Sequence, residues 1–373
     1  MPNSQPLVTH VVRQFLPNRG GLEDVVANLC KQLPSLGYRT RVVTLDRLFV
    51  EPDKLLPAQE TIAGIDVVRI PWQGSTRYPL APRVFRHLAD ADIVHVHAVD
   101  FFFDALAWGR MLHGKPMIAT THGGFFHTQK FAAIKKVWFN TLTRASASAY
   151  RDLVCCSLSD LQTFKPIASR ATLIENGADT EKFANRASIS PVKGLITIGR
   201  FSTNKQLPRL IAAMRTLIDR DPDWRLTIAG VASDLSEADL RQAIAAHRLE
   251  HAVNLVVGAS NDDIAKLMED ASLFVSASDY EGFGLVAIEA MSAGLIPVLQ
   301  PNDAYRALAA RHDTIRLADF ASPQAGAAEI QEAFDALSDH PASRGTAIAA
   351  AADYAWPAVA CRYADLYDQI LKR

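Results

Sequence analysis

The stretch EGFGLVAIEAMSAGLIPVL (residues 281–299) predicts a loop, a helix and a short apolar strand in direct succession. Glu281 therefore precedes a helix N-terminus, where backbone N–H groups without intrahelical partners favour an anion, and a phosphate also binds at such a place. No cation stands next to Glu281, and Glu289 follows two turns into the helix. Two carboxylates that flank a phosphate pocket suit a ligand rich in phosphate and hydroxyl groups.

The alternation of apolar strand and helix extends outward from this stretch over most of the chain. Strands are predicted at residues 7–12, 91–99, 116–121 and 152–157, and again at 194–200, 224–230, 253–258, 272–278 and 295–299. Strands that alternate with helices form parallel sheets with right-handed crossovers. The expected fold is therefore α/β, with two Rossmann-like doubly wound domains that face a cleft and bind ligands at the carboxyl ends of their strands.

The segment at 165–193 carries turn formers and little periodicity, and we interpret it as the interdomain connection. The expected domains are residues 1–172 and 173–352, followed by an amphipathic helix pattern at the C-terminal end. The length of 373 residues agrees with two domains, because it exceeds what one ordinary core supports.

The composition is that of a soluble globular protein, with 49% apolar residues and a net charge of −1. Nothing in that charge argues for a nucleic-acid partner. The four cysteines are scattered without a CxxC pair, so neither a disulfide framework nor a zinc site is indicated, and the cytosol is the simplest location. No apolar run has the length of a signal-peptide core or a membrane span.

Two motifs at strand ends predict contacts to phosphate. In FLPNRGGLEDVV, Gly20 and Gly21 let the backbone approach a ligand at a helix N-terminus. A glycine pair is a weak signal, and a tight turn without a ligand is an equal alternative. In GRFSTNK, Arg200 and Lys205 follow a strand, and a guanidinium fork with an ammonium group suits a diphosphate. The alternative is that Arg200 and Lys205 are two ordinary solvated surface cations.

Histidines gather near the ends of two predicted strands. His122, in TTHGGFFHT, can donate a hydrogen bond to a substrate or transfer a proton, and the alternative is a capping or core histidine. His95 and His97 share one strand face and, with His122 and His127, make a metal site conceivable. No carboxylate or cysteine stands at ligand spacing, so no metal is expected.

The segment KFAAIKKVWFNTLTR (130–144) predicts a helix with an apolar, partly aromatic stripe. The stripe consists of Phe131, Ile134, Trp138 and Leu142, and the basic residues are Lys130, Lys135, Lys136 and Arg144, with no acid among them. Such a helix can lie on an anionic membrane surface. The equally weighted alternative is a helix that packs its stripe on its own sheet.

The motifs GRFSTNK and EGFGLVAIE, with the early GG, resemble the retaining glycosyltransferases of family 4, which have the GT-B fold. The resemblance covers nearly the whole chain. It is most specific in VVRQFLPNRGG, STRYPLAP, THGGFFHT and WFNTLTR, which look like the α-mannosyltransferases that build xanthan- and acetan-type bacterial exopolysaccharides. Those enzymes transfer mannose from GDP-mannose to a cellobiosyl-diphosphopolyprenol, forming an α-1,3 link.

This resemblance implies three partners: a nucleotide sugar, a polyprenyl-diphosphate-linked oligosaccharide and the inner-membrane surface. It places the protein in the cytoplasm, peripheral on the inner face of the cell membrane, and implies no cofactor, with GDP-mannose as substrate. It also implies that residues 353–373 cross back to the N-terminal domain.

The resemblance implies roles for individual residues as well. Glu281 contacts hydroxyls of the donor sugar, Glu289 binds the ribose, and Arg200 with Lys205 neutralises the leaving diphosphate. His122 lies near the donor sugar. The implied catalytic set is His122, Arg200, Lys205 and Glu281, and the implied donor-binding set is Gly20, Gly21, Gly282, Phe283, Gly284, Leu285 and Glu289.

Two stretches depart from the family pattern. Gln206 stands where a glycine usually follows the lysine, and LQPNDAYRA replaces a glycine-containing loop after the last strand. Other readings also stay open at this point. A transferase for UDP-glucose or UDP-GlcNAc would use the same charged residues. The base contacts that discriminate these donors are expected near VVGASNDD (256–263) and are mostly made by the backbone, so the sequence reveals them poorly. A GT-B nucleotide-sugar epimerase and a non-catalytic scaffold are further alternatives, and the intact charged residues argue against the scaffold.

Overall fold

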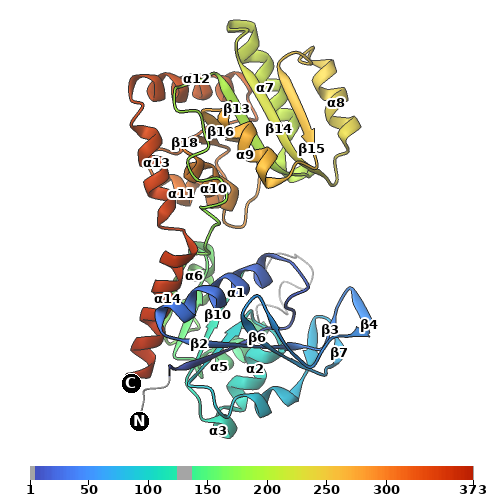
Figure 1. The fold of residues 1–373 in the computed structure, drawn as a ribbon, viewed down its shortest axis with the longest axis vertical. Helices are drawn as coiled ribbons and strands as arrows, with labels where there is room; N and C mark the ends of the chain where they lie inside the picture. The colour runs from blue at the N-terminus through green and yellow to red at the C-terminus, as the bar shows by residue number, and fades with distance from the viewer. Residues whose placement is uncertain (1–4, 124–136, 373) are drawn as a thin grey trace. The chain divides into compact units, whose positions relative to one another are not determined.

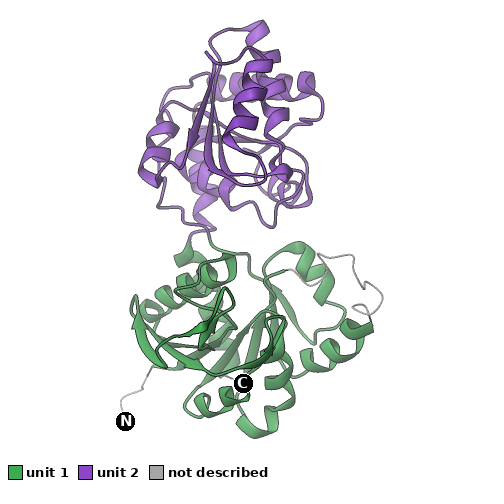
Figure 2. Cartoon of the chain, turned by 90° about the vertical axis from the view of Figure 1, so that its right-hand side faces the viewer, with its two compact units in different colours: residues 1–177, 356–373 green, residues 178–355 purple. Residues whose placement is uncertain are grey.

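The computed structural model describes residues 5–123 and 137–372, which fold into two compact units (Figure 2). Unit 1 combines residues 1–177 with 356–373, and unit 2 comprises residues 178–355. The expected boundaries were residues 172 and 352. Unit 1 extends past residue 172 because strand β12 (Ala171–Leu173) pairs with β11 (Asp152–Cys155). Part of the segment interpreted as a connection is therefore a strand of the sheet.

Unit 1 is built on an eight-stranded sheet in the order β12-β11-β10-β9-β1-β2-β6-β5. Its remaining strands are β1 (Leu7–Val11), β2 (Arg39–Leu45), β5 (Gln59–Ile62), β6 (Ile65–Ile70), β9 (Ile93–His97) and β10 (Met117–Thr120). Strands β2, β6 and β10 of this sheet are labelled in Figure 1. All neighbours are parallel except β5 and β6. The order reverses between β1 and β9, so the carboxyl ends of these two strands flank a topological switch point. Two small hairpins, β3–β4 (Arg47–Leu48 and Glu51–Leu55) and β7–β8 (Gln73–Ser75 and Tyr78–Leu80), lie outside this sheet.

Alternate residues of these strands face two helical layers. Ile93 packs with helices α1 (Gly21–Gln32) and α14 (Trp356–Leu371), whereas Val94 packs with α2 (Phe101–Trp108). Helix α14 lies along this sheet because its apolar residues recur every three or four positions. They are Trp356, Val359, Ala360, Tyr363, Leu366, Tyr367 and Ile370, all buried. The other helices in the described part of unit 1 are α3 (Arg110–His113), α5 (Arg144–Ala147) and α6 (Leu158–Phe164). Leu33–Leu36 and Pro82–His87 form short 3-10 helices, and Phe139–Thr143 forms a π-helical segment.

Unit 2 holds a six-stranded parallel sheet in the order β15-β14-β13-β16-β17-β18. The strands are β13 (Gly194–Phe201), β14 (Arg225–Ala232), β15 (Val253–Val257), β16 (Leu273–Ser276), β17 (Ile296–Leu299) and β18 (Arg316–Leu317). The helices are α7 (Leu207–Arg220), α8 (Glu237–Ala246), α9 (Asn261–Glu269), α10 (Leu285–Ala293), α11 (Asp303–Ala309), α12 (Pro323–Asp339) and α13 (Ser343–Ala352). This order is that of a Rossmann fold, with its switch point between β13 and β16. Both units confirm the predicted α/β class.

Candidate functional site

The switch point of unit 2 joins the two charged motifs found in the sequence. Lys205 ends the short turn after β13, and Glu281 lies in the loop after β16. Lys205 Nζ lies 2.5 Å from Glu281 Oε1, and their side chains are only 20% and 16% exposed. The cation that Glu281 lacks in its own segment thus comes from 76 residues earlier in the chain.

The loops that carry these two residues are fastened to each other. Asn204 donates a side-chain hydrogen bond to the Tyr280 carbonyl at 3.1 Å, and the Asp279 N–H donates to the Asn204 carbonyl at 2.9 Å. Arg209 and Asp279 add an ion pair at 2.7 Å. Both strand ends therefore hold their charged side chains in one defined arrangement, as electrostatic stabilisation by preorganised groups requires.

Tyr305 supports Glu281 from below. It lies in the divergent LQPNDAYRA segment, is buried, and donates to Glu281 Oε1 at 3.2 Å, while its oxygen lies 3.1 Å from Ser276 Oγ. Burial, and then the Glu281 charge, raises the pKa of Tyr305, so the phenol stays a donor. Gly284 precedes α10 with φ +89°, and a Cβ there would lie 2.9 Å from the Tyr305 ring. A glycine is therefore required at this helix N-terminus.

Arg200 and Lys205 line the same small cavity at the carboxyl end of β13. Arg200 is exposed and forms no ion pair with any residue that the structure describes. Next to it, Gly199 and Gly230 bring β13 and β14 close together, because a Cβ on Gly230 would lie 1.8 Å from the Gly199 carbonyl oxygen. Arg200 and Lys205 thus lie next to backbone that carries no side chains, at Gly199 and Gly230. Gln206, the first departure from the family pattern, adopts the left-handed region at φ +49°, which a glycine adopts without strain.

Glu289 lies on α10, with Leu285 as the first residue of that helix. Its carboxylate is 3.6 Å from Lys182 Nζ. Burial raises the pKa of Glu289, and Lys182 opposes that shift. Gly282 is exposed, and the half-buried Phe283 ring lies 5.8 Å from that of Tyr354. The structure thus sets Glu281 and Glu289 in different local surroundings, the first with Lys205 and the second with Lys182.

In unit 1, helix α1 begins at the predicted glycine pair. Gly20 is extended, at φ −165°, and precedes the first helical residue, Gly21. A Cβ on Gly21 would meet no atom within 4 Å, and a Cβ on Gly20 would meet only the end of the Glu23 side chain at 2.7 Å. The packing of the fold therefore does not require glycine at position 21. Close approach of a ligand to the helix N-terminus would explain the glycine.

His122 follows β10 in a strained but well-held turn. Its φ is +55°, in the left-handed region that non-glycine residues rarely adopt. Asp160 brackets it: one carboxylate oxygen accepts from the Thr121 hydroxyl at 2.6 Å and from the Gly123 N–H at 2.9 Å. Sequence analysis did not single out Asp160, whose position inside a helical pattern gave no signal.

The predicted pairing of His95 and His97 on one strand face is confirmed, and His10 of β1 joins them. His10 Nδ1 lies 3.0 Å from His97 Nε2, and His97 Nδ1 lies 2.9 Å from His122 Nε2. His95 bonds instead to Tyr367 and Thr120, at 2.7 Å each. Burial lowers the pKa of all four rings, to about 3 for His10 and about 4 for His122.

Of the predicted membrane segment, Lys130, Lys135 and Lys136 lie outside the described residues. Trp138 is 45% exposed and Arg144 is exposed, whereas Phe139 and Thr143 are buried. The face that packs on unit 1 is thus a different one from the predicted Trp138–Leu142 stripe. Trp138 of that stripe faces solvent, whereas Phe131 and Ile134 lie outside the described residues.

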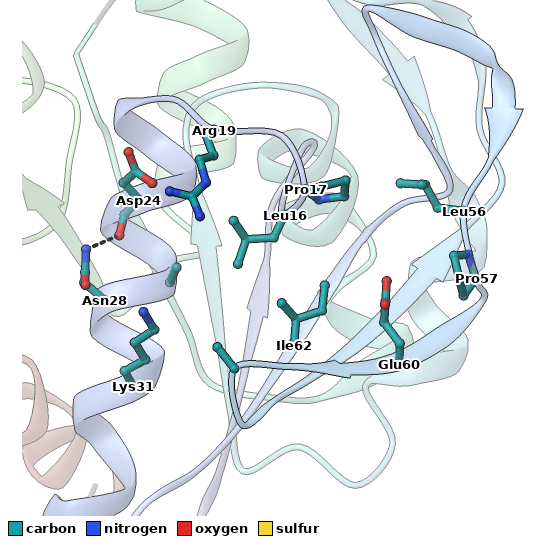
Figure 3. A pocket seen from close by; sticks show the side chains of 12 residues that line it. Leu16, Pro17, Arg19, Asp24, Asn28, Lys31, Leu56, Pro57, Glu60 and Ile62 are labelled. Atoms are coloured by element: carbon teal, nitrogen blue, oxygen red, sulfur yellow. Dashed lines mark hydrogen bonds between the residues drawn. The ribbon is translucent and has the colours of Figure 1, made fainter. Parts of the chain in front are cut away.

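A cavity with a volume of about 630 Å³ lies in unit 1. Figure 3 shows Asp24, Asn28 and Lys31 of α1 on one side and Leu56, Pro57 and Glu60 on the other. None of the predicted catalytic or donor-binding residues lines this cavity. The predicted catalytic and donor-binding residues therefore lie outside this cavity.

Comparison with known families matches both units. Residues 19–182 match the family model "Glycosyltransferase Family 4", and residues 179–344 match "Glycosyl transferases group 1". The chain is 42% identical, over 98% of its length and 97% of the relative's, to a protein of Xanthomonas oryzae pv. oryzae named GDP-mannose:cellobiosyl-diphosphopolyprenol alpha-mannosyltransferase. A protein of the same name from Komagataeibacter xylinus is also 42% identical, over 98% of this chain and 94% of that one.

Among solved structures, HepE of Anabaena in complex with UDP is similar to this chain with a TM-score of 0.71. The two share 17% identity over 98% of this chain and 100% of that one. A likeness at this identity shows the fold, and that fold is GT-B, as the sequence predicted.

Proposed function

The chain belongs to the family 4 glycosyltransferases of GT-B fold, and from this premise we propose that it is a retaining α-mannosyltransferase of bacterial exopolysaccharide synthesis. Its donor is GDP-mannose, and its acceptor is cellobiosyl-diphosphopolyprenol, to which it adds mannose in an α-1,3 link. The observation that carries the proposal is the 42% identity over 98% of the chain to proteins of that name. The Lys205–Glu281 pair at the switch point of unit 2 supports it, because a nucleotide sugar presents both phosphate and hydroxyl groups.

Unit 2 holds the donor in this proposal. Negative charge grows on the diphosphate as the anomeric bond breaks, and the transition state at the sugar has oxocarbenium character. Arg200 and Lys205 neutralise the diphosphate, and the N-terminus of α10 adds backbone N–H groups. Glu281 accepts hydrogen bonds from sugar hydroxyls, and Glu289 accepts from the ribose.

In unit 1, the proposal gives His122 and the glycine pair Gly20 and Gly21 the roles that their match to the family motifs implies. No metal is required in this scheme, since Arg200, Lys205 and the N-terminus of α10 balance the leaving charge. Retention follows from attack on the face that the diphosphate leaves. This route needs no second carboxylate as nucleophile.

The direct test offers a synthetic cellobiosyl-diphosphate lipid with labelled GDP-mannose, UDP-glucose or UDP-GlcNAc in separate reactions that contain EDTA. We expect transfer of mannose alone, with the α configuration in the product by NMR. Transfer from a UDP sugar would replace the donor assignment, and β-linked product would exclude retention. Loss of transfer in EDTA, restored by a divalent cation, would show that a metal is required.

We further propose that the protein works at the inner face of the cell membrane, to which its lipid acceptor is confined. No helix within the described ranges has the length and apolarity to cross a bilayer. Support for a peripheral contact comes from Trp138 and its neighbour Val137, which are 45% and 65% exposed. An exposed tryptophan on a segment that also carries the exposed Arg144 is suited to the interface of an anionic membrane.

Replacing Trp138 by alanine is expected to weaken binding to vesicles that contain anionic phospholipid, by about tenfold, because an interfacial indole is lost. The measurement is co-sedimentation of the full chain with the vesicles. Ile189→Ala is the matched control, since Ile189 is 85% exposed but belongs to unit 2. Equal binding by Trp138→Ala and the wild type would place the contact elsewhere.

A further inference from the structure

His10, His97 and His122 form a hydrogen-bonded row, and the two ends of this row differ. At the buried end, His10 Nε2 has no hydrogen-bond partner among the described residues. At the other end, His122 is partly exposed, and its Nδ1 makes no hydrogen bond to the part of the chain that the structure describes. Between them, His97 uses both of its ring nitrogens, one toward each neighbour.

A neutral imidazole has one N–H and one lone pair, so the two hydrogen bonds of this row must run in the same direction. If every ring carries its proton on Nδ1, His10 donates to His97, His97 donates to His122, and a lone pair is left at His10 Nε2. In the reverse arrangement an N–H is left at that buried atom without an acceptor. Buried N–H groups without acceptors are rarer in proteins than buried acceptors without donors, which favours the first arrangement.

The rings are neutral, as this argument needs. Burial lowers the pKa of His10 to about 3 and that of His122 to about 4, and it also lowers the pKa of His97 well below its usual range. Among the described residues, no carboxylate forms a hydrogen bond or ion pair with these three rings. Their neighbour from β9 is His95, which packs against His10 and His97 and bonds to Tyr367 of α14 and Thr120 of β10.

We propose that His10 and His97 are positioning residues that fix His122 as the Nδ1–H tautomer, so that it meets the substrate as a hydrogen-bond donor and does not act as a base. The lone pair on His122 Nε2 is occupied by His97, and the free ring nitrogen carries the proton. The assignment of the substrate as a nucleotide sugar rests on the proposed function. The tautomer itself rests only on the geometry of unit 1.

The backbone around His122 serves the same end. Asp160 holds the residues on both sides of it, through the Thr121 hydroxyl and the Gly123 N–H, in a conformation that φ +55° makes unfavourable for a free histidine. The ring is therefore held over His97 at a centroid distance of 5.2 Å. A fixed ring with a fixed proton is what an electrostatically preorganised donor requires.

A metal ion is the competing use of the same residues, because nitrogens of His10, His95 and His97 lie within 4.8 Å of one another. In the structure these nitrogens are largely committed to hydrogen bonds: His95 to Tyr367 and Thr120, and His10 to His97. The hydrogen-bonded row is thus the arrangement that the observed contacts favour, and a bound metal is an outcome of the test.

The test is nitrogen NMR of the full chain with ¹⁵N-labelled histidine at pH 7.5, with the signals assigned from single substitutions. We expect His10, His97 and His122 each to show a protonated Nδ1 and an unprotonated Nε2, unchanged by EDTA. Protonation on Nε2, an imidazolium, or signals that move when EDTA removes a metal would each overturn the proposal. This readout needs no enzymatic activity, so it is decided separately from the mannose-transfer assay.

Two variants of His97 test the effect on the reaction. His97→Asn keeps an amide nitrogen near the position of Nδ1 and can still donate to His122, whereas His97→Gln places its amide near Nε2 and cannot. We expect His97→Gln to lower kcat about 10–100-fold with little change in KM for the donor, because the side chain that orients His122 by a hydrogen bond is lost. We expect His97→Asn to retain most of kcat.

His95→Gln is the control for damage to the core, since His95 is equally buried but lies outside the row. Thermal melts show whether each variant is folded. If His97→Asn and His97→Gln lower kcat equally while both are folded, His97 does not act by donating to His122. If either variant fails to fold, the tautomer measured in the wild-type protein still decides the proposal.

Discussion

Replacing Lys205 by alanine is expected to lower kcat/KM for mannose transfer about 10³-fold. Lys205 is the ammonium group that meets Glu281 at the switch point of unit 2, at 2.5 Å, and we assign it to the leaving diphosphate. A cation fixed in a partly buried site stabilises developing charge much more than a solvated one does, because less water screens it. The measurement is initial-rate kinetics with labelled GDP-mannose and the lipid acceptor.

Lys193 provides the matched control. It also pairs with a carboxylate, that of Asp221, but it lies before the start of β13, whereas Lys205 lies beyond its end. Lys193→Ala is expected to leave kcat/KM unchanged, and Lys205→Arg is expected to recover part of the loss since it restores the charge without the same geometry. A loss below tenfold in Lys205→Ala would remove Lys205 from the catalytic set.

Acid is expected to destabilise unit 1 steeply, starting near pH 6.5. The pKa values of His10, His95, His97 and His122 are lowered in the fold by burial, so the unfolded chain binds four protons more readily as the pH falls below 6.5. The buried Asp100 acts in the opposite sense, because burial raises its pKa to about 7 and the folded state gains a proton there. The net of about three protons corresponds to a loss of roughly 4 kcal/mol per pH unit between pH 6.5 and about 4.

Urea unfolding followed by tryptophan fluorescence at several pH values measures this slope, and four of the five tryptophans lie in unit 1. His95→Gln removes one of the four histidine titrations, so the stability of this variant is expected to fall less steeply with acid, by about 1.4 kcal/mol per pH unit. His340→Gln changes an exposed residue of unit 2 and is expected to leave the slope unaltered. A flat profile between pH 6.5 and 5 would contradict the burial of neutral histidines.

The strands that the sequence predicted correctly are short apolar runs between turn formers, and this pattern needs no tertiary information. The strands β2, β5 and β6 were missed for a physical reason. Strand β6 contains Arg69, which is 4% exposed and pairs with Glu60 of β5, so a buried charge interrupts the apolar pattern. Strand β5 is an antiparallel edge strand with exposed residues and has little apolar signal of its own.

The candidate site divides along the same line. Lys205 and Glu281 were predictable because each follows an apolar strand, and parallel strands end at the same edge of a sheet. Their direct pairing was not, since it depends on β13 lying next to β16. His10 was missed because only the register of β1 on β9 places it opposite His95. Tyr305 was missed because its segment departs from the family pattern.

Helix α14 has a consequence for how the protein is made. Its tyrosines close the apolar face of unit 1, where Tyr367 meets His95 and Tyr363 meets Thr120, yet the ribosome delivers it only after all of unit 2. During translation, one face of the sheet of unit 1 stays incompletely covered until unit 2 has been synthesised, whereas unit 2 can complete its own core as it emerges. Nascent unit 1 therefore exposes apolar surface for longer than unit 2 does, and we expect it to be the part of the chain that most needs a chaperone. A premature stop codon anywhere before residue 356 removes the last helix of unit 1.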